Sequence, residues 1–523
     1  MKMPRPAASL LALSLAAPLA GCPEQRSRTE VKPPPQATLA AGTAGAPDVL
    51  TLRRPAGPEY FGFYVGGKKA GWLRTDLTRE LRDGKDVLVA RETMVLKVKT
   101  DGRPVERRQE EERIFEARPG GRLLSFTADM RGDGGDRLLR GTCARGRCTV
   151  KVESPGRAPV ERVLEVTVPS EQADPARLAA ARRTTVRGPV IETLRIKVKQ
   201  METSFVRREK LVRGGAEEEV SVVAEQEVGD RMPLEYRIAD DGRVLDIRQG
   251  DGLVVLPEPE ARATSLEDVD LPLLGRVALP RPLPSDVPAK ITYDLAGLPR
   301  PFWTNSERQR FEAGPNGTAR LTVTARAPAA ADPARDTPLA QAGRGADPAD
   351  LAATGAVDSD APEIVALARE IAGDAPGAYA AAKRLNEHVH RLLTTTMGAS
   401  QDRASDVLRA RQGDCSEHAL LTVALARAIG IPAREVYGLV YSRMGGQEGL
   451  YWHDWVEIRS AGEWIAIDPT FGQPVADATH IALSGGDRSE VGGLLTALKV
   501  MAVEVHPPEA TPQRAVRPAS GVK

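Results

Sequence analysis

The sequence has 523 residues, of which 41% are hydrophobic and 27% are charged, as in an ordinary soluble globular protein. These proportions exclude collagen-like, coiled-coil and wholly disordered chains. The 72 basic and 71 acidic residues leave a formal net charge of +1, which argues against a nucleic-acid partner, because such proteins carry a clustered basic excess. Four cysteines in a chain of this length exclude a disulfide-rich miniature scaffold.

The N-terminus has the pattern of a bacterial export signal. Two basic residues precede an apolar run over residues 7–20, which is too short to span a bilayer core of ~30 Å as a helix. The run ends in a Leu-Ala-Gly-Cys sequence at Cys22 that resembles the lipobox of bacterial lipoproteins. The resemblance implies that residues 1–21 are removed and that Cys22 is lipidated. The protein is then anchored by this lipid in the bacterial cell envelope, facing the periplasm or the cell surface. A plain secretory signal with an incidental cysteine is the alternative.

Residues 22–50 are rich in proline, alanine, glycine and charge, and we expect them to form a disordered tether. Beyond them, residues 51–326 alternate short apolar runs with turn dipeptides such as Asp241-Gly242 and Asn316-Gly317, a pattern typical of antiparallel hairpins. We expect one or two antiparallel β domains, divided if there are two into 51–180 and 181–326. The Ala-, Pro- and Gly-rich residues 327–360 predict a linker.

Cys143 and Cys148 form a C-x₄-C pair that is predicted to lie at a hairpin tip. In the oxidising envelope such a pair favours a small disulfide loop. A metal site would need further ligands, and this region has no histidine. Free thiols are the remaining alternative.

The C-terminal part predicts helices over 361–395 and then a helix that begins at Cys415. Asp414 is a good N-cap residue, Glu417 completes a capping box, and the Gly430 region ends the helix. A cysteine at a helix start lies where the dipole stabilises a thiolate, although it is equally typical of a small core residue. His388 and His390 are two residues apart, so they do not share a helix face, and we expect no metal site there.

A hairpin follows this helix and places a histidine near a carboxylate. If residues 459–462 form its loop, Ile458 pairs with Glu463, and His453 then lies directly opposite Asp468 on one sheet face. A carboxylate beside an imidazole orients the ring and stabilises its protonated form. The order Cys415, His453, Asp468 therefore predicts a nucleophile, a base and an orienting acid.

Four sequence blocks together resemble the bacterial transglutaminase-like superfamily, which has a papain-like fold; they lie at 413–419, 428–434, 453–457 and 464–470. The resemblance covers about 361–485 and implies an α+β domain, which we place at 361–505, after the β region. It also implies that Cys415 is the nucleophile, His453 the base and Asp468 the orienting residue, and that Tyr437 and Trp455 line the substrate site. Calcium-binding loops have no counterpart here, so we expect no metal and no cofactor. Residues 506–523 are expected to be a disordered tail.

The shared step of this fold is attack of a thiolate on an amide to give a thioester. We therefore expect an envelope-anchored acyl transferase or hydrolase that acts on protein or peptide substrates, peptidoglycan peptides included. Water completes hydrolysis and an amine completes cross-linking, and the sequence does not choose between them. A non-catalytic envelope scaffold that retains the fold is the alternative, since the β region is larger than an enzyme domain needs. The oligomeric state is left open.

Overall fold

A computed structural model describes residues 47–506 apart from the short segments 101–102, 133–135, 157, 195, 214–215, 230–231, 251, 268, 270–275, 285–288, 397–400, 402, 445–446 and 486–497. The predicted signal peptide over 1–21, Cys22, most of the predicted tether over 22–50, and residues 507–523 of the predicted tail lie outside the described residues. Of the helices in the described part, none combines the length and the hydrophobicity needed to cross a membrane.

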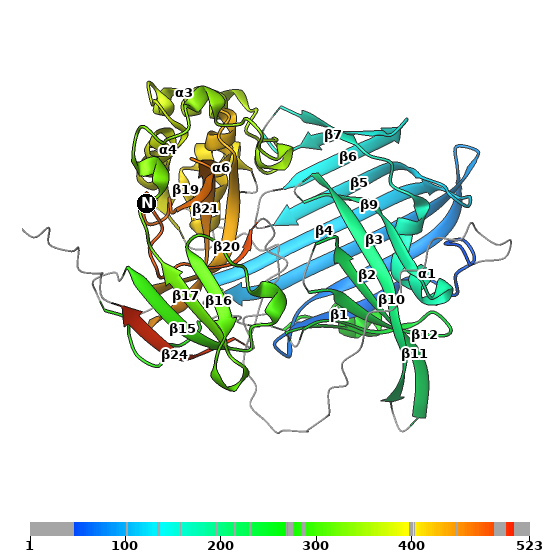
Figure 1. Cartoon of the computed structure of the whole chain (residues 1–523). Coiled ribbons are helices and arrows are strands. Elements are labelled where there is room, and N and C mark those ends of the chain that lie inside the picture. The colour runs from blue at the N-terminus through cyan, green and yellow to red at the C-terminus, as the bar shows by residue number, and fades with distance from the viewer. Residues whose placement is uncertain are drawn as a thin grey trace, which may run out of the picture.

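The N-terminal part is one antiparallel sheet of 14 strands (Figure 1). Its first eight strands are β1 (Glu59–Val65), β2 (Lys68–Arg82), β3 (Lys85–Thr100), β4 (Arg103–Glu116), β5 (Leu123–Gly132), β6 (Arg137–Ala144), β7 (Arg147–Glu153) and β8 (Val160–Glu165). The others are β9 (Thr185–Glu192), β10 (Lys197–Arg213), β11 (Ala216–Glu227), β12 (Leu234–Ala239), β13 (Val244–Gln249) and β14 (Leu253–Pro257). The short helices η1 (Ser170–Ala173), α1 (Pro175–Arg182) and α2 (Glu260–Ala263) accompany them.

The sheet is continuous across the boundary that the sequence placed between 51–180 and 181–326. The strand β1 pairs with β2 on one side and with β14 on the other, so it joins the strands of both predicted domains. The strands β9 and β10 then cross the face of β2–β5 (Figure 1). Ile191 and Ile196 pack with Leu139 and Val150 of β6 and β7, so the two halves of the sheet share a hydrophobic core.

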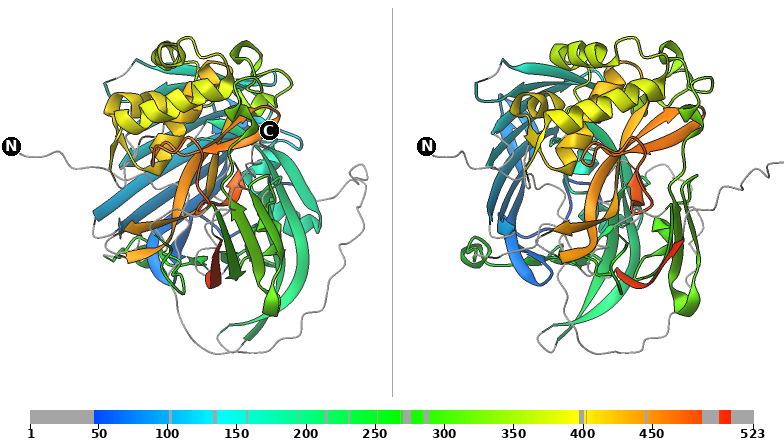
Figure 2. Two further views of the ribbon diagram at one scale, coloured as in Figure 1. Left: turned by 60° about the vertical axis from the view of Figure 1, so that its left-hand side comes forward. Right: turned by 90° about the vertical axis from the view of Figure 1, so that its left-hand side faces the viewer.

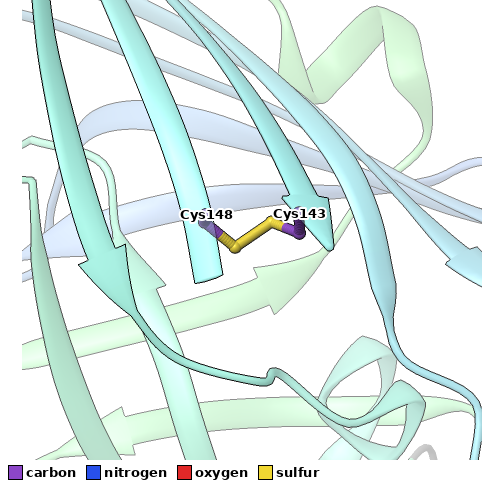
Figure 3. Close-up of a disulfide and its surroundings, with 2 residues drawn as sticks. All are labelled: Cys143 and Cys148. Atoms are coloured by element: carbon purple, nitrogen blue, oxygen red, sulfur yellow. A yellow bond between two sulfur atoms is a disulfide. The ribbon is translucent and has the colours of Figure 1, made fainter. Parts of the chain in front are cut away.

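Cys143 at the end of β6 and Cys148 at the start of β7 form a disulfide (Figure 3). The two residues are directly opposite each other in the hairpin register. The bond closes the small loop that the C-x₄-C spacing predicts.

A second, four-stranded sheet has the order β16-β17-β15-β24. Its strands are β15 (Lys290–Ala296), β16 (Gln309–Ala313), β17 (Ala319–Thr324) and β24 (Lys499–His506), with η2 (Arg300–Phe302) and η3 (Pro315–Gly317) between them. The sequence analysis assigned β24 to the C-terminal domain over 361–505, but β24 pairs with β15. About 200 residues of chain separate these strands, and local patterning carries no information on such long-range pairing.

The C-terminal domain packs helices on a sheet of order β22-β21-β20-β23 (Figure 2). Its elements are α3 (Pro362–Ala372), α4 (Ala378–Leu392), β18 (Thr394–Thr395), α5 (Ala404–Ala410), β19 (Gln412–Gly413), α6 (Cys415–Ala428), β20 (Ala433–Met444), β21 (Gln447–Ser460), β22 (Glu463–Ile467) and β23 (Ile481–Gly485). The helix α6 is buried from Glu417 to Ala426. Such a helix needs small and apolar residues on every side, which its sequence supplies.

Residues 327–360, expected to be a linker, belong to this domain instead. They contain three short helices, η4 (Ala329–Ala331), η5 (Leu339–Gln341) and η6 (Pro348–Asp350). Asp358 is fully buried and accepts hydrogen bonds from the backbone and hydroxyl of Ser405, and Arg403 donates to it as well. Composition alone predicts a linker, because local patterning does not reveal that Asp358 bonds to residues 45 and 47 positions later in the chain.

Asp336 provides a test of this assignment. Its carboxylate accepts from the backbone N–H groups of Tyr379 and Ala380 at 2.9 and 3.0 Å, and from the hydroxyl of Ser460 at 2.7 Å. It therefore caps α4 from outside the helix. We expect Asp336→Ala to lower the free energy of unfolding by about 1–3 kcal/mol in urea denaturation. Asp332→Ala, at an exposed position of the same segment, is the control. Equal unfolding midpoints for the two variants would contradict the anchoring role.

Candidate active site

Cys415 is the first residue of α6, and a capping box fixes this position. The carboxylate of Asp414 accepts from the N–H of Ser416, and that of Glu417 accepts from the N–H of Asp414, each at 2.9 Å. Cys415 is partly exposed. At the positive end of the helix dipole, negative charge on its sulfur, or on an oxygen bound beside it, is stabilised.

The helix start is joined to the strand that carries the candidate base. The hydroxyl of Ser416 donates to Oδ2 of Asp454 at 2.9 Å. These residues follow Cys415 and His453 directly in the sequence. The contact therefore holds the segment with Cys415 against the segment with His453.

His453 on β21 and Asp468 just after β22 are joined by a hydrogen bond of 2.8 Å between Nε2 and Oδ2. The hairpin register differs from the expected one by two residues: Ser460, not Ile458, pairs with Glu463. The turn consists of Ala461 and Gly462 alone, with φ values of 52° and 80°, as in a type I′ turn. Because a shift of two residues preserves the side-chain alternation, both side chains stay on one face, diagonally rather than directly opposed.

The carboxylate of Asp468 is fully buried and accepts four hydrogen bonds. Oδ2 accepts from His453 and, at 2.9 Å, from His480, whereas Oδ1 accepts from the N–H groups of Thr470 and Phe471 at 2.7 and 3.0 Å. Burial alone would raise the pKa of Asp468, but the charge and hydrogen bond of His453 and those of His480 hold the pKa well below its usual range. Asp468 is therefore an anion throughout the neutral range.

His480 is a member of the site that the sequence analysis did not find. Its Nε2 contacts Asp468 and its Nδ1 lies 3.1 Å from Oδ1 of Asp477. Burial alone would lower the pKa of His480, but the hydrogen bonds to both aspartates and their charges raise it. Since carboxylates only accept hydrogen bonds, both ring nitrogens donate, and His480 is an imidazolium. Asp477 and His480 form an isolated Asp-x-x-His pattern, which belongs to no periodic pattern or motif that would predict a site.

The loop that carries His480 is held by the second sheet. The guanidinium of Arg308 donates to the carbonyls of Ala476 and Asp477 at 2.8 and 2.7 Å. The amide of Gln309 on β16 bonds both the carbonyl and the N–H of Ala482, at 2.8 and 2.9 Å. Two consecutive residues from a distant part of the chain thus position the inner part of the site.

Phe471 lies at the outer face of His453. Their rings are stacked, with centroids 4.9 Å apart, and Phe471 keeps 39% of its surface exposed. His453 itself is 2% exposed. Phe471 therefore shields the imidazole from water and offers an aromatic surface next to it, another contribution that the sequence analysis missed.

Tyr437 and Trp455 do not line the site, contrary to expectation. Both are fully buried. Tyr437 packs in the core shared with the second sheet and donates its hydroxyl to Glu435 at 2.7 Å. Trp455 is two residues from His453 on the same strand, and its ring packs inward with Ala476 and edge-on to His480. Because side chains alternate along a strand, Trp455 lies on the same side of β21 as His453. Its ring is buried in the interior rather than at the surface of the site.

Nε2 of His453, Oδ2 of Asp468 and Nε2 of His480 lie within 4.8 Å of one another, a group with the composition of a metal site. Each of these atoms is already used in a hydrogen bond, and His480 is protonated at both nitrogens. Hydrogen bonds between these side chains therefore satisfy the charges of the cluster. Since Nε2 of His453 donates to Asp468, Nδ1 is the ring nitrogen that remains to take a proton from a thiol.

Comparison with known proteins finds a family for part of the chain. Residues 365–469 match the Transglutaminase-like superfamily. The chain therefore contains a transglutaminase-like domain, and Cys415, His453 and Asp468 all lie within the matched residues. None of the curated proteins compared with the chain is significantly similar in sequence.

Three solved structures are similar to parts of the chain. One, from Cytophaga hutchinsonii, is provisionally described as a cysteine protease; it is 17% identical with a TM-score of 0.28 and covers 42% of this chain and 85% of its own. A β-barrel-like protein of unknown function from Brucella abortus is 11% identical with a TM-score of 0.30, over 40% of this chain and 96% of its own. A protein from Parabacteroides distasonis, provisionally described as a protease, is 12% identical with a TM-score of 0.18, over 53% and 71%.

The raised pKa of His480 predicts a pH dependence of stability. Its imidazolium stabilises the fold fully below its unfolded pKa of about 6.5, and this contribution is lost as the pH rises through the higher folded pKa. We expect the difference in unfolding free energy between wild type and His480→Gln to shrink as pH rises through this window in urea titrations. Burial, with the charge of Arg391, lowers the pKa of His388, so His388→Gln should give the opposite sign. A pH-independent difference for His480→Gln would contradict the charged bridge.

Proposed function

We propose that the protein is a thiol-dependent acyl transferase or hydrolase that acts on amide bonds of protein or peptide substrates through Cys415, His453 and Asp468. One observation carries the proposal: inside a transglutaminase-like domain, Ser416 beside Cys415 at the start of α6 is hydrogen-bonded to Asp454, which follows the His453 of the buried His453–Asp468 pair. A carboxylate, an imidazole and a thiol in this order are the groups that thioester chemistry needs.

The proposed reaction begins when Nδ1 of His453 takes the thiol proton of Cys415. The sulfur attacks the amide carbonyl carbon, and the new oxyanion is stabilised at the start of α6. The imidazolium then returns the proton to the leaving nitrogen as the C–N bond breaks, which leaves a thioester. Asp468 stabilises the imidazolium during this step, and His480 and the backbone of Thr470 and Phe471 hold Asp468 in place.

Water or a primary amine completes the cycle by attacking the thioester, with His453 again as the base, and Cys415 is regenerated. The exposed ring of Phe471, stacked on His453, is the surface proposed for the acyl part of the substrate. The proposed chemistry requires an amide carbonyl, which every peptide supplies. Peptidoglycan peptides are within this substrate class.

The proposed setting is the bacterial cell envelope, with the chain held on the membrane by a lipid on Cys22. Two features support this setting: the lipobox-like sequence that ends at Cys22 and the disulfide between Cys143 and Cys148, which is typical of oxidising compartments. Metabolic labelling with a clickable palmitate analogue, compared between wild type and Cys22→Ala, tests the anchor.

The catalytic roles predict a graded loss of activity. With envelope extracts as acyl donors and a fluorescent primary amine as acceptor, we expect Cys415→Ala to abolish both amine incorporation and hydrolysis. Asp468→Asn should reduce the rate about 10²- to 10⁴-fold, because the imidazolium loses its counter-charge. Asp332→Asn, at an exposed position outside the site, should match wild type. Full activity of Cys415→Ala would contradict the assigned nucleophile, and absence of activity in the wild type would favour the scaffold alternative.

Thiol reactivity offers a test that needs no substrate. Among the described residues Cys415 is the cysteine outside a disulfide, whereas Cys143 and Cys148 are bonded to each other. We expect iodoacetamide at mildly acidic pH to alkylate Cys415 faster than a free thiol, because His453 and the helix start stabilise the thiolate. Peptide mass spectrometry should show slower labelling in His453→Gln and unchanged labelling in His388→Gln. A wild-type rate equal to that of glutathione would rule out an activated nucleophile.

A further inference from the structure

The 14-stranded sheet lines an open cavity of about 520 Å³, far in the sequence from the candidate active site. This volume is within the range of small-molecule sites in proteins. One wall comes from β2, β3 and β4, and the facing wall from β9 to β13, which cross over them (Figure 1). The start of α1 closes one side with Asp174 and Arg177.

Three cross-strand rows form the wall from β2, β3 and β4. The register aligns Leu73 with Met94 and Gln109, Thr75 with Glu92 and Glu111, and Leu77 with Ala90 and Arg113. All nine residues line the cavity. Side chains that lie directly opposite in a sheet point to the same face, so the wall has one polar row with apolar groups on both sides.

The ionisable groups of the cavity are unbalanced. Its lining has four arginines and seven carboxylates, the latter being Glu59, Asp76, Glu92, Glu111, Asp174, Glu192 and Glu225. The arginines already have partners: Arg113 pairs with Glu111 at 2.7 Å and Arg177 with Glu59 at 2.6 Å. Arg54 and Arg91 also contact carboxylates. The cavity therefore has an excess of negative charge that its own arginines do not neutralise.

Glu92 and Glu225 carry this excess. Among the described residues, Glu92 has neither a hydrogen bond nor an ion pair, and Glu225 accepts only from the hydroxyls of Tyr236 and Thr203, at 3.0 and 3.1 Å. Glu92 is exposed to solvent inside the open cavity, so its unpaired carboxylate is accessible to a ligand cation.

Unpartnered amide atoms lie in the same lining. Oε1 of Gln109 and Nε2 of Gln172 are buried and have no hydrogen-bond partner among the described residues. Gln109 is in the row next to Glu92, so its oxygen adds a neutral acceptor near the carboxylate. An acceptor of this kind is suited to the N–H groups of a cation.

We propose that this cavity binds a small amphipathic amine, with its ammonium group on Glu92 and Glu225 and its apolar part against Leu73 and Met94. The ammonium would replace the missing counter-charge, and the flanking apolar rows would bury the hydrocarbon. A free amine and the side chain of a lysine in a peptide share this chemistry. The site does not depend on the thiol chemistry proposed above, since it uses none of its residues.

The test uses the full chain and three matched probes in titration calorimetry: 4-phenylbutylamine, 4-phenylbutanol and 4-phenylbutyrate. We expect one-to-one binding of the amine, about 10- to 100-fold tighter than that of the alcohol, since hydrogen bonds to charged groups are the stronger ones. Glu92→Gln and Glu225→Gln, checked for folding by circular dichroism, should each remove most of this preference. Glu161→Gln, at an exposed position on β8, is the control.

Nα-acetyl-lysine methylamide, added as a fourth probe, distinguishes the sources: binding equal to that of phenylbutylamine indicates a peptide lysine, and much weaker binding a free amine. Three results would overturn the proposal. These are no saturable amine binding at millimolar concentrations, equal binding of amine and alcohol, and amine binding that survives both glutamine substitutions. Loss of thiol activity in Cys415→Ala with amine binding intact would show that the two sites are separate.

Discussion

The carboxylate of Asp468 is the group on which the candidate active site depends. It is fully buried, and an anion in that position is stable only when donors surround it. Two imidazoles and two backbone N–H groups supply those donors, and each comes from a segment that must be in place first. The position of His453 therefore depends on the folding of three segments: β21, the turn after β22 and the loop that carries His480.

This dependence explains why the site requires more chain than the matched family domain. The loop with His480 lies outside residues 365–469 and is held by Arg308 and Gln309, which lie more than 50 residues before that domain begins. Asp336 and Asp358 fasten the domain's helices from the segment in between. The second sheet, closed by β24 from the far end of the chain, thus supports the candidate catalytic residues rather than forming a separate module.

The large sheet presents a different physical situation. At the active site every buried charge has a partner, whereas the cavity between β2–β4 and β9–β13 leaves Glu92 without one. Glu92 is exposed to solvent in this open cavity, where a ligand can reach its carboxylate. One chain therefore combines a satisfied charge network, suited to holding a base in position, with an unsatisfied one, suited to receiving a ligand.

The sequence alone was sufficient wherever the signal is local. The capping box of Asp414 and Glu417 placed Cys415 at a helix start, and alternation in the hairpin put His453 and Asp468 on one face, because both patterns span only a few residues. The C-x₄-C spacing was likewise enough to predict the disulfide loop. These local patterns, together with the resemblance that they carry, identified the domain and its three central side chains.

Tertiary structure decided everything that joins distant segments. The exact hairpin register, the burial of Tyr437 and Trp455, the second contact of Asp468 with His480, and the pairing of β24 with β15 all depend on packing between parts of the chain far apart in sequence. The four cysteines and the balanced charge of +1 seen at the outset had excluded whole classes of protein. They held no information on where an unpaired Glu92 would lie, because a net charge sums over residues while a cavity depends on which of them the fold brings together.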